Sequence, residues 1–196
     1  MKNIFSCIQL IFLITILSGN ALYSQEFYGT EAMNKIKEAE RVRFNPIRKS
    51  IDFVQLKSST EINESNHFSW LTDKILKTNN ASTLQLKNRR QDKQDYVHYQ
   101  YKQYYKGLPV EYSMYKAHFK EGKLESVNGE YYSDIHVKTT PSLSKAEAFS
   151  KALLAMKATK FKDANSIGLE DSRKMGELLI LPLEGKMYLA YKFDIY

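Results

Sequence analysis

The sequence predicts an α+β protein made of two small units, each a helix packed on a curled antiparallel sheet, after a cleaved leader. Two stretches place apolar residues at helical spacing, and each is followed by stretches in which apolar and polar residues alternate. The same Glu-Gly-Lys turn signal occurs once in each half, at residues 121–123 and 184–186. This internal echo favours two units of related architecture.

Residues 1–24 have the layout of a secretory signal peptide. Lys2 precedes an apolar run at residues 8–17, and small or polar residues follow as far as Ser24. The run is shorter than the ~20 residues that cross a bilayer, and Cys7 precedes it, whereas a lipid-modified cysteine would follow it. We therefore expect cleavage after Ser24 or Gln25, secretion into an extracellular or periplasmic space, and no stable membrane anchor.

Composition narrows the possible chemistry and partners. The chain carries 29 Lys and Arg against 22 Asp and Glu, a net charge of +7. Cleavage would remove Lys2 and, with Cys7, the single cysteine, which excludes a cysteine nucleophile or cysteine-ligated zinc in the mature chain. Charges of both signs interleave, as in residues 87–95, which is typical of a solvated face. We expect no nucleic-acid partner and, instead, docking on an acidic surface.

The N-terminal part is predicted to be a helical lead-in over residues 25–49. Apolar residues at helical spacing predict a helix over residues 30–43, and Pro46 ends it. Residues 50–60 have a mixed pattern, which predicts a loop with room for one short strand.

The first unit begins with a helix predicted over residues 65–77. Ser65 or Asn66 can cap it. Its apolar side consists of Phe68, Leu71, Ile75 and Leu76.

Three antiparallel strands are predicted after this helix. From residue 97 the period is two, so that Val97, Tyr99 and Tyr101 share one face while His98, Gln100 and Lys102 share the other. A second strand is expected over residues 110–120 and, after a turn at 121–123, a third over residues 124–132. The dense tyrosines of residues 96–119 could stack nucleic-acid bases, but packing in a half-buried sheet is the favoured interpretation.

The second unit starts after a break at residues 139–143. Ser144 and Glu147 match a capping box, and the helix that follows has one apolar stripe consisting of Phe149, Ala152, Leu153 and Met156. Strands are expected over residues 177–183 and 187–196, with alternate residues of the last strand pointing one way. Because the sequence reaches Tyr196 within a strand, we expect a larger parent polypeptide.

The sequence contains no recognisable catalytic set. Of its four histidines, His67, His98, His118 and His136, none forms a His-Glu-x-x-His motif, and no phosphate-binding loop or Gly-x-Ser-x-Gly is present. His98 and His118 could meet across neighbouring strands, but no third metal ligand is evident. We therefore predict no catalytic residue, no metal site and no cofactor.

Residues 98–129 resemble the signature of the fungalysin/thermolysin propeptide (FTP) domain: a His-containing tyrosine-rich strand, Lys-Gly-Leu-Pro-Val, a strand ending near a His, a Gly turn and Val-Asn-Gly. Gln100 departs from the arginine that is common there, and residues 111–113 depart from the usual small residues. The matching positions are His98, Tyr101, Gln103, Tyr105, Gly107, Leu108, Pro109, Val110, His118, Gly122, Val127, Asn128 and Gly129. We expect structural roles for them, with Gly107 in a turn, Pro109 at a strand edge, and Val110 directed at the helix of residues 65–77.

The second half is similar to a PepSY domain, on the stretches PSLSKAEAFSKAL and LAYKFDIY. The resemblance implies two cystatin-like units, FTP-like at residues 50–138 and PepSY-like at 139–196, in the order found in pro-regions of secreted bacterial thermolysin-like zinc metallopeptidases. It implies a non-catalytic zymogen segment that acts as intramolecular chaperone and inhibitor of a protease domain in cis. The alternative is a free-standing secreted protease inhibitor or protein-binding module. The residues of the partner interface are not assigned.

Overall fold

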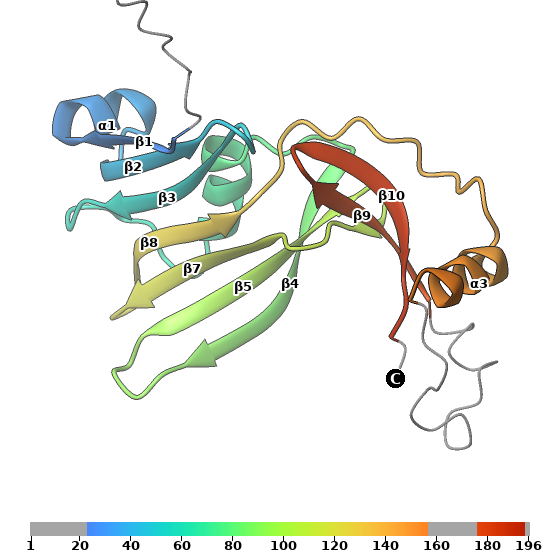
Figure 1. Cartoon of the computed structure of the whole chain (residues 1–196). Coiled ribbons are helices and arrows are strands. Elements are labelled where there is room, and N and C mark those ends of the chain that lie inside the picture. Colours follow the sequence, from blue (N-terminus) through green and yellow to red (C-terminus); the bar gives the residue numbers. More distant parts are fainter. Residues whose placement is uncertain (1–22, 157–175, 195–196) are drawn as a thin grey trace, which may run out of the picture.

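The computed structural model describes residues 23–156 and 176–194 (Figure 1). The predicted signal peptide lies almost wholly outside these ranges, as do Ile195 and Tyr196. The described residues form an α+β molecule in which antiparallel strands predominate and helices are few. Within these ranges, no helix is long and apolar enough to cross a membrane.

One large antiparallel sheet contains the first eight strands, in the order β1-β2-β3-β8-β7-β5-β4, with β6 paired to β5. Neighbours β5, β7 and β8 are the predicted three-stranded meander, which is confirmed. The strands are β1 (Gln25–Tyr28), β2 (Ala39–Asn45), β3 (Ser50–Leu56), β4 (Ser82–Gln91), β5 (Val97–Tyr105), β6 (Leu108–Pro109), β7 (Met114–Lys120) and β8 (Lys123–Glu130).

The helix predicted over residues 30–43 is wrong beyond Lys35. Helix α1 covers only Gly29–Lys35, Ile36 is already extended, and β2 then pairs with both β1 and β3. The residues of β2 also alternate, with Val42 buried between charged neighbours, and pairing on both sides outweighs the weak helical pattern. The expected helical lead-in is therefore mostly strand.

Residues 50–60, expected to be mainly loop, contain the full-length strand β3 between β2 and β8. Its alternation is hidden in the sequence because two of the buried positions, Ser50 and Asp52, are polar. Asp52 is stabilised there by Arg43 and Arg48, whose guanidinium groups lie 2.5 and 2.9 Å from its carboxylate. The boundary drawn after residue 49 thus falls between two paired strands.

Strand β4 is absent from the sequence-based prediction. It is an edge strand paired to β5 alone, and its side chains are exposed from residue 85 onward. A strand that is exposed on both faces shows no hydrophobic alternation. The charged second half of β4 therefore has the sequence pattern of a solvated segment.

The helix predicted over residues 65–77 is present as α2 (His67–Trp70) followed by a π-helical turn, η1 (Leu71–Ile75). Leu71, Ile75 and Leu76 are buried as expected, but Phe68 is 41% exposed and His67 is buried in its place. Asn66 occupies the cap position, but no side-chain hydrogen bond caps the helix.

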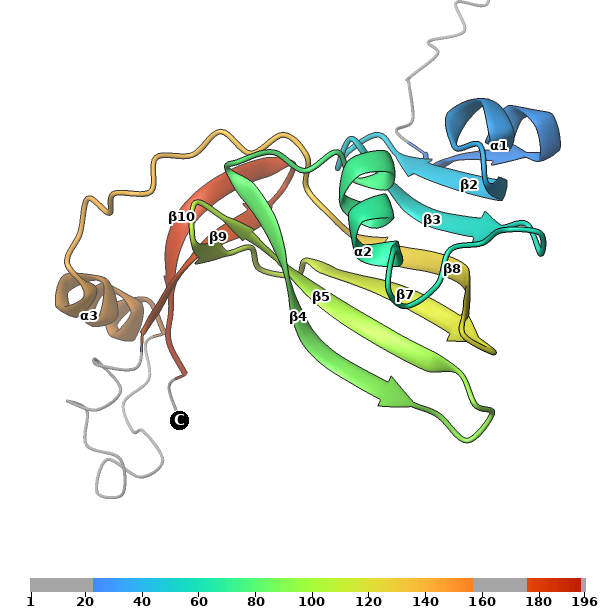
Figure 2. The same cartoon turned by 180° about the vertical axis from the view of Figure 1, so that it is seen from behind.

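The sheet has two unlike faces, which we call the helix-covered face and the open face. On the helix-covered face, α2 and η1 lie over a core that includes Tyr101, Tyr115, Phe119 and Val127 (Figure 2). Figure 1 looks onto the open face, which no described helix covers. Strand register places on it Asn88, Arg90, His98, Gln100, Lys102, Lys116, His118, Ser126 and Asn128.

The C-terminal part consists of α3 (Lys145–Met156) and the antiparallel hairpin of β9 (Glu177–Leu183) and β10 (Lys186–Lys192). The predicted capping box is confirmed: the Glu147 amide donates to Ser144 Oγ at 3.3 Å, and the Ser144 amide to Glu147 Oε2 at 2.8 Å. Phe149 is buried with its ring 5.2 Å from that of Phe193, whereas Met156 is half exposed, so only part of the predicted stripe is buried.

Val110 does not face the helix of residues 65–77 as predicted. Its side chain belongs to a second core with Tyr105, Ile135 and Ile180, and the Glu111 amide donates to the Ile180 carbonyl at 2.8 Å. The strand expected from residue 110 begins only at Met114 because the chain leaves the sheet after β6 to bridge to β9.

Candidate functional site

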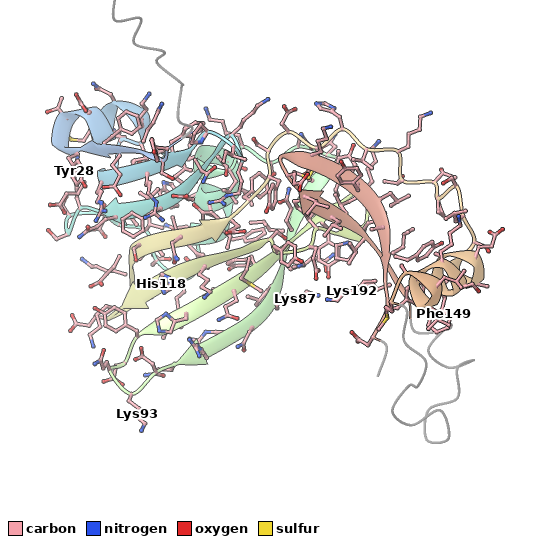
Figure 3. All side chains as sticks on the ribbon, viewed as in Figure 1. Tyr28, Lys87, Lys93, His118, Phe149 and Lys192 are labelled. Atoms are coloured by element: carbon pink, nitrogen blue, oxygen red, sulfur yellow. The ribbon has the colours of Figure 1, made fainter. Side chains whose placement is uncertain are left out.

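Four polar side chains of the open face form one hydrogen-bonded chain, the histidine relay: Asp92, His98, His118 and Asn128. His98 Nε2 lies 3.0 Å from Asp92 Oδ2, the two Nδ1 atoms of His98 and His118 are 2.7 Å apart, and His118 Nε2 lies 2.6 Å from Asn128 Oδ1. Figure 3 labels His118 on β7. The two histidines meet as the sequence predicted.

Strand pairing and one tight loop position these groups. His98 in β5 pairs directly with His118 in β7, and Asn128 in β8 is the diagonal neighbour of His118 on the same face. Asp92 closes the loop after β4, where its Oδ1 atom accepts hydrogen bonds from the amides of Gln94 at 2.8 Å and Tyr96 at 3.0 Å. Its second carboxylate oxygen is thereby directed at His98.

The partners at the two ends decide where the protons lie. A carboxylate and an amide oxygen only accept hydrogen bonds, so the Nε2 atoms that face Asp92 and Asn128 both carry hydrogen. The Nδ1 atoms then face each other at 2.7 Å and share one further proton. The pair then holds one more proton than two neutral rings, with the carboxylate of Asp92 on the His98 side and the amide of Asn128 on the His118 side.

The electrostatics of the relay agree with this assignment. Burial lowers the pKa of His118, and the positive charges of His98, Lys116 and Arg90 lower it further against the opposing hydrogen bond to Asn128. The hydrogen bond from His98 lowers the pKa of Asp92. A positive charge is therefore disfavoured on His118, and Asp92 is the anion of the relay.

Cations and an aromatic ring surround the relay. Among the described residues, neither Lys116 nor Arg90 has a carboxylate within ion-pair distance. The Tyr96 ring stacks on His98, with centroids 6.1 Å apart and planes 7° apart, and the Lys120 ammonium lies 5.1 Å from the Tyr96 centroid. This part of the open face is thus positively charged and suited to contact with carboxylates.

A second network, the His67 network, lies on the helix-covered face. His67 Nδ1 is 2.9 Å from the Glu64 carbonyl oxygen, and Nε2 is 2.6 Å from the Tyr101 hydroxyl. The Tyr99 hydroxyl donates to the Glu64 carboxylate, which also accepts from Arg89 at 2.9 Å. Burial lowers the pKa of His67. This network fastens the start of α2 to β4 and β5.

Other motif residues have structural roles. The Gln103 amide, which is 1% exposed, donates to the Tyr132 carbonyl at 2.7 Å and accepts from the Tyr132 amide at 3.0 Å. Gly129 has φ +148°, and a Cβ there would lie 2.1 Å from the Met114 carbonyl oxygen. Gly107 and Gly122 have positive φ in turns, as predicted.

Of the motif residues, only His98, His118 and Asn128 come together in a polar site. Tyr105, Leu108 and Val110 belong to the second core, Pro109 lies in the short edge strand β6, and Tyr101 serves the His67 network.

Sequence reasoning missed Asp92 and His67. Asp92 lies within the charged run of residues 87–95, and the available signal was an aspartate opening a short polar loop before a strand. His67 gives no signal, because its partners come from elements distant in sequence.

The described residues contain no group of three or more His, Cys, Asp or Glu side chains that could hold a metal ion. In the relay, Asp92 lies at the Nε2 side of His98, away from the Nδ1 atom that faces His118. What the geometry offers is therefore a shared proton and local positive charge.

Comparison with known proteins gives one family match in this region. The family described as Fungalysin/Thermolysin Propeptide Motif matches residues 82–131. The matched segment begins at the first residue of β4, ends just after β8, and contains all four relay residues. No curated protein matches the chain.

Proposed function

We propose that the chain is the pro-region of a secreted thermolysin-like metallopeptidase, which it helps to fold and holds inactive until cleavage. The match of residues 82–131 to the propeptide family carries this proposal. The matched strands β4 to β8 form the part of the sheet whose open face carries the relay and its cations. A propeptide that guides folding needs such a surface, since it must present a rigid template to an unfinished catalytic domain.

The proposal includes finer features of the sequence interpretation. Residues 1–24 are the signal peptide, and residues 139–196 are a PepSY-like unit that, like the FTP-like unit, has a cystatin-like fold. The catalytic domain is joined in cis and contains the zinc-binding motif, since this sequence has no His-Glu-x-x-His. The positive net charge favours docking on an acidic surface of that domain.

The open face is the docking surface in this proposal. It lacks a covering helix in the described part of the chain, and Lys116 and Arg90 on it have no carboxylate partner there. Cations without a carboxylate partner on an open sheet face attract carboxylates of a partner and set the orientation of docking.

The test is refolding of a denatured thermolysin-like catalytic domain with this chain added in trans. We expect a higher yield of native protease and inhibition of its peptidase activity. Reversing charge with Arg90→Glu and Lys116→Glu should weaken inhibition about tenfold, whereas Lys74→Glu, on the η1 side of the sheet, should have little effect. Unchanged refolding yield together with no inhibition contradicts the proposal.

A free-standing inhibitor or binding module is the second candidate. It is favoured by the two hydrophobic cores that the described residues form among themselves. The reading frame beyond Tyr196 separates the two. Continuation into a domain with His-Glu-x-x-His supports the pro-region, and a stop codon supports the free-standing inhibitor.

A further inference from the structure

We propose that the histidine relay is an acid-sensitive latch, in which one shared proton joins β5 to β7 near neutral pH and a second proton separates the two rings. The latch would regulate the docking face, and this regulatory role rests on the function proposed above. The latch itself is a property of this chain alone.

The distance between the rings limits the number of protons they can hold. At 2.7 Å, the two Nδ1 atoms of His98 and His118 have room for one hydrogen between them. If both rings were imidazolium, two N–H groups would point at each other, and both ends of the contact would be positively charged. The doubly charged state therefore requires the rings to move apart.

Removing the shared proton has a different consequence. A neutral pair keeps one hydrogen on the Nδ1 of His118 and one on the Nε2 of His98, so His118 Nε2 becomes an acceptor. The Asn128 amide must then rotate to donate its NH₂ group. The orientation found here, with Oδ1 facing the ring at 2.6 Å, corresponds to the singly charged pair.

Groups from every neighbouring element set the charge balance. Asp92, in the β4–β5 loop, places its carboxylate oxygen 3.0 Å from His98 Nε2. Arg90 from β4 and Lys116 from β7 oppose a second charge on His118. The carboxylate of Glu125 from β8 raises the pKa of Tyr96, whose ring stacks on His98. The one carboxylate in direct contact is already paired, so a second proton meets mainly positive charge.

Acid should therefore loosen this end of the sheet. Because the folded-state pKa of His118 is lowered, the unfolded chain binds the proton first, and stability is lost as pH falls below the usual histidine value of about 6.5. The lowered pKa of Asp92 matters only below its ordinary value of 3.8. Added positive charge on the open face would itself favour binding of an acidic partner. An exposed charge pair stabilises a complex less than an intact, half-buried hydrogen-bond network stabilises the surface that the partner binds, so the net effect of acid should be weaker docking.

The protonation pattern can be read directly by ¹⁵N NMR of the histidine rings in the full chain. Near pH 7.5, we expect hydrogen on the Nε2 atoms of both rings, which face Asp92 and Asn128, and one hydrogen shared between the two Nδ1 atoms. Two neutral rings near pH 7.5, or two independent titrations at the ordinary histidine pKa, would overturn the latch.

Denaturant unfolding at about pH 7.5 and pH 5.5 measures its energetic role. Asn128→Asp gives His118 a carboxylate partner and should reduce the loss of stability on acidification, as should His118→Gln. Asn88→Asp adds the same charge to the same row of the open face without touching the relay, and should behave like the parent. His67 contributes equally in all these chains. Equal acid sensitivity in the parent, Asn128→Asp and His118→Gln contradicts the latch.

Inhibition of the catalytic domain in trans at the same two pH values tests the regulatory role. The parent should lose inhibition on acidification, and Asn128→Asp should retain more of it. If the parent and this variant inhibit with the same pH dependence, the latch does not control docking. If the chain inhibits at neither pH, the proposed function fails, and the NMR and unfolding results still decide the latch.

Discussion

The two faces of the large sheet carry histidines with opposite surroundings. On the helix-covered face, His67 is 3% exposed and bonds to a backbone carbonyl and a tyrosine hydroxyl, both of which are uncharged. On the open face, His98 and His118 bond to each other between an aspartate and an asparagine. A neutral ring satisfies both partners of the first arrangement, whereas the second has two facing ring nitrogens that must share a hydrogen.

The difference shows that partners, more than burial, decide what a histidine can do. Burial lowers the pKa of both His67 and His118. His118, unlike His67, is hydrogen-bonded to a second imidazole, that of His98, which in turn contacts the carboxylate of Asp92. A change of pH is therefore expected to move atoms at His118 and not at His67. The helix-covered face is therefore expected to be a fixed support for a responsive open face.

The largest expected effect comes from Gly129→Ala, which should disturb both faces together. A Cβ at this position would lie 2.1 Å from the Met114 carbonyl oxygen and 2.7 Å from the Tyr115 Cα atom, so β7 and β8 would have to separate. Such a backbone clash should lower the free energy of unfolding by about 3 kcal/mol or more, measured by urea titration.

Gly107 provides the comparison for Gly129. It has φ +83°, but a Cβ added there would meet no atom within 4 Å, so Gly107→Val should cost only the backbone strain, about 1–3 kcal/mol. If the two substitutions lower the free energy of unfolding equally, the close approach of β7 and β8 is not the reason why position 129 requires glycine.

The next effect should be confined to the helix-covered face. His67→Leu leaves the Tyr101 hydroxyl without its partner and should cost about 1–3 kcal/mol. Combining it with Tyr101→Phe should cost less than the sum of the two single changes, because both remove the same hydrogen bond. The relay resonances should be unchanged; a shift in them would mean that the two faces are coupled.

How far the sequence predicted this arrangement differs between the two faces. That His98 and His118 could meet across neighbouring strands followed from the alternation of residues, because period-two patterns fix which side chains share a face. Asp92, β3 and β4 were missed for physical reasons. A buried aspartate interrupts the alternation of β3, and an exposed edge strand has none.

Long-range contacts account for the remaining errors. Val110 packs against Ile180, a residue 70 positions away, and no local pattern indicates which of two cores a buried valine joins. His67 likewise depends on Tyr101 in another element. Sequence therefore predicted β5, β7 and β8 better than the partners of buried side chains.

A smaller and more local effect is expected from Asp92→Asn. Asparagine can keep the hydrogen bonds to the Gln94 and Tyr96 amides, so the loop should persist while the negative charge is lost. Without the carboxylate, the hydrogen bond from His98 Nε2 loses its charged acceptor, so the ¹⁵N chemical shift of that ring nitrogen should change. An unchanged Nε2 shift would mean that Asp92 is not the hydrogen-bond acceptor of His98.

The smallest expected effect is that of Lys116→Gln, and it separates charge from hydrogen bonding within the relay. The Lys116 ammonium contributes to lowering the pKa of His118, and it makes no hydrogen bond to the relay itself. Its removal should therefore raise the pKa of His118 slightly towards the value in the unfolded chain, so that less stability is lost on acidification. Because salt screens charges that lie near the surface, this difference should shrink as salt is added. His67, on the other side of the sheet, should titrate as in the parent. A shift of the same size at His67 would mean that the substitution acts through a general change in the fold and not through the local field of the open face.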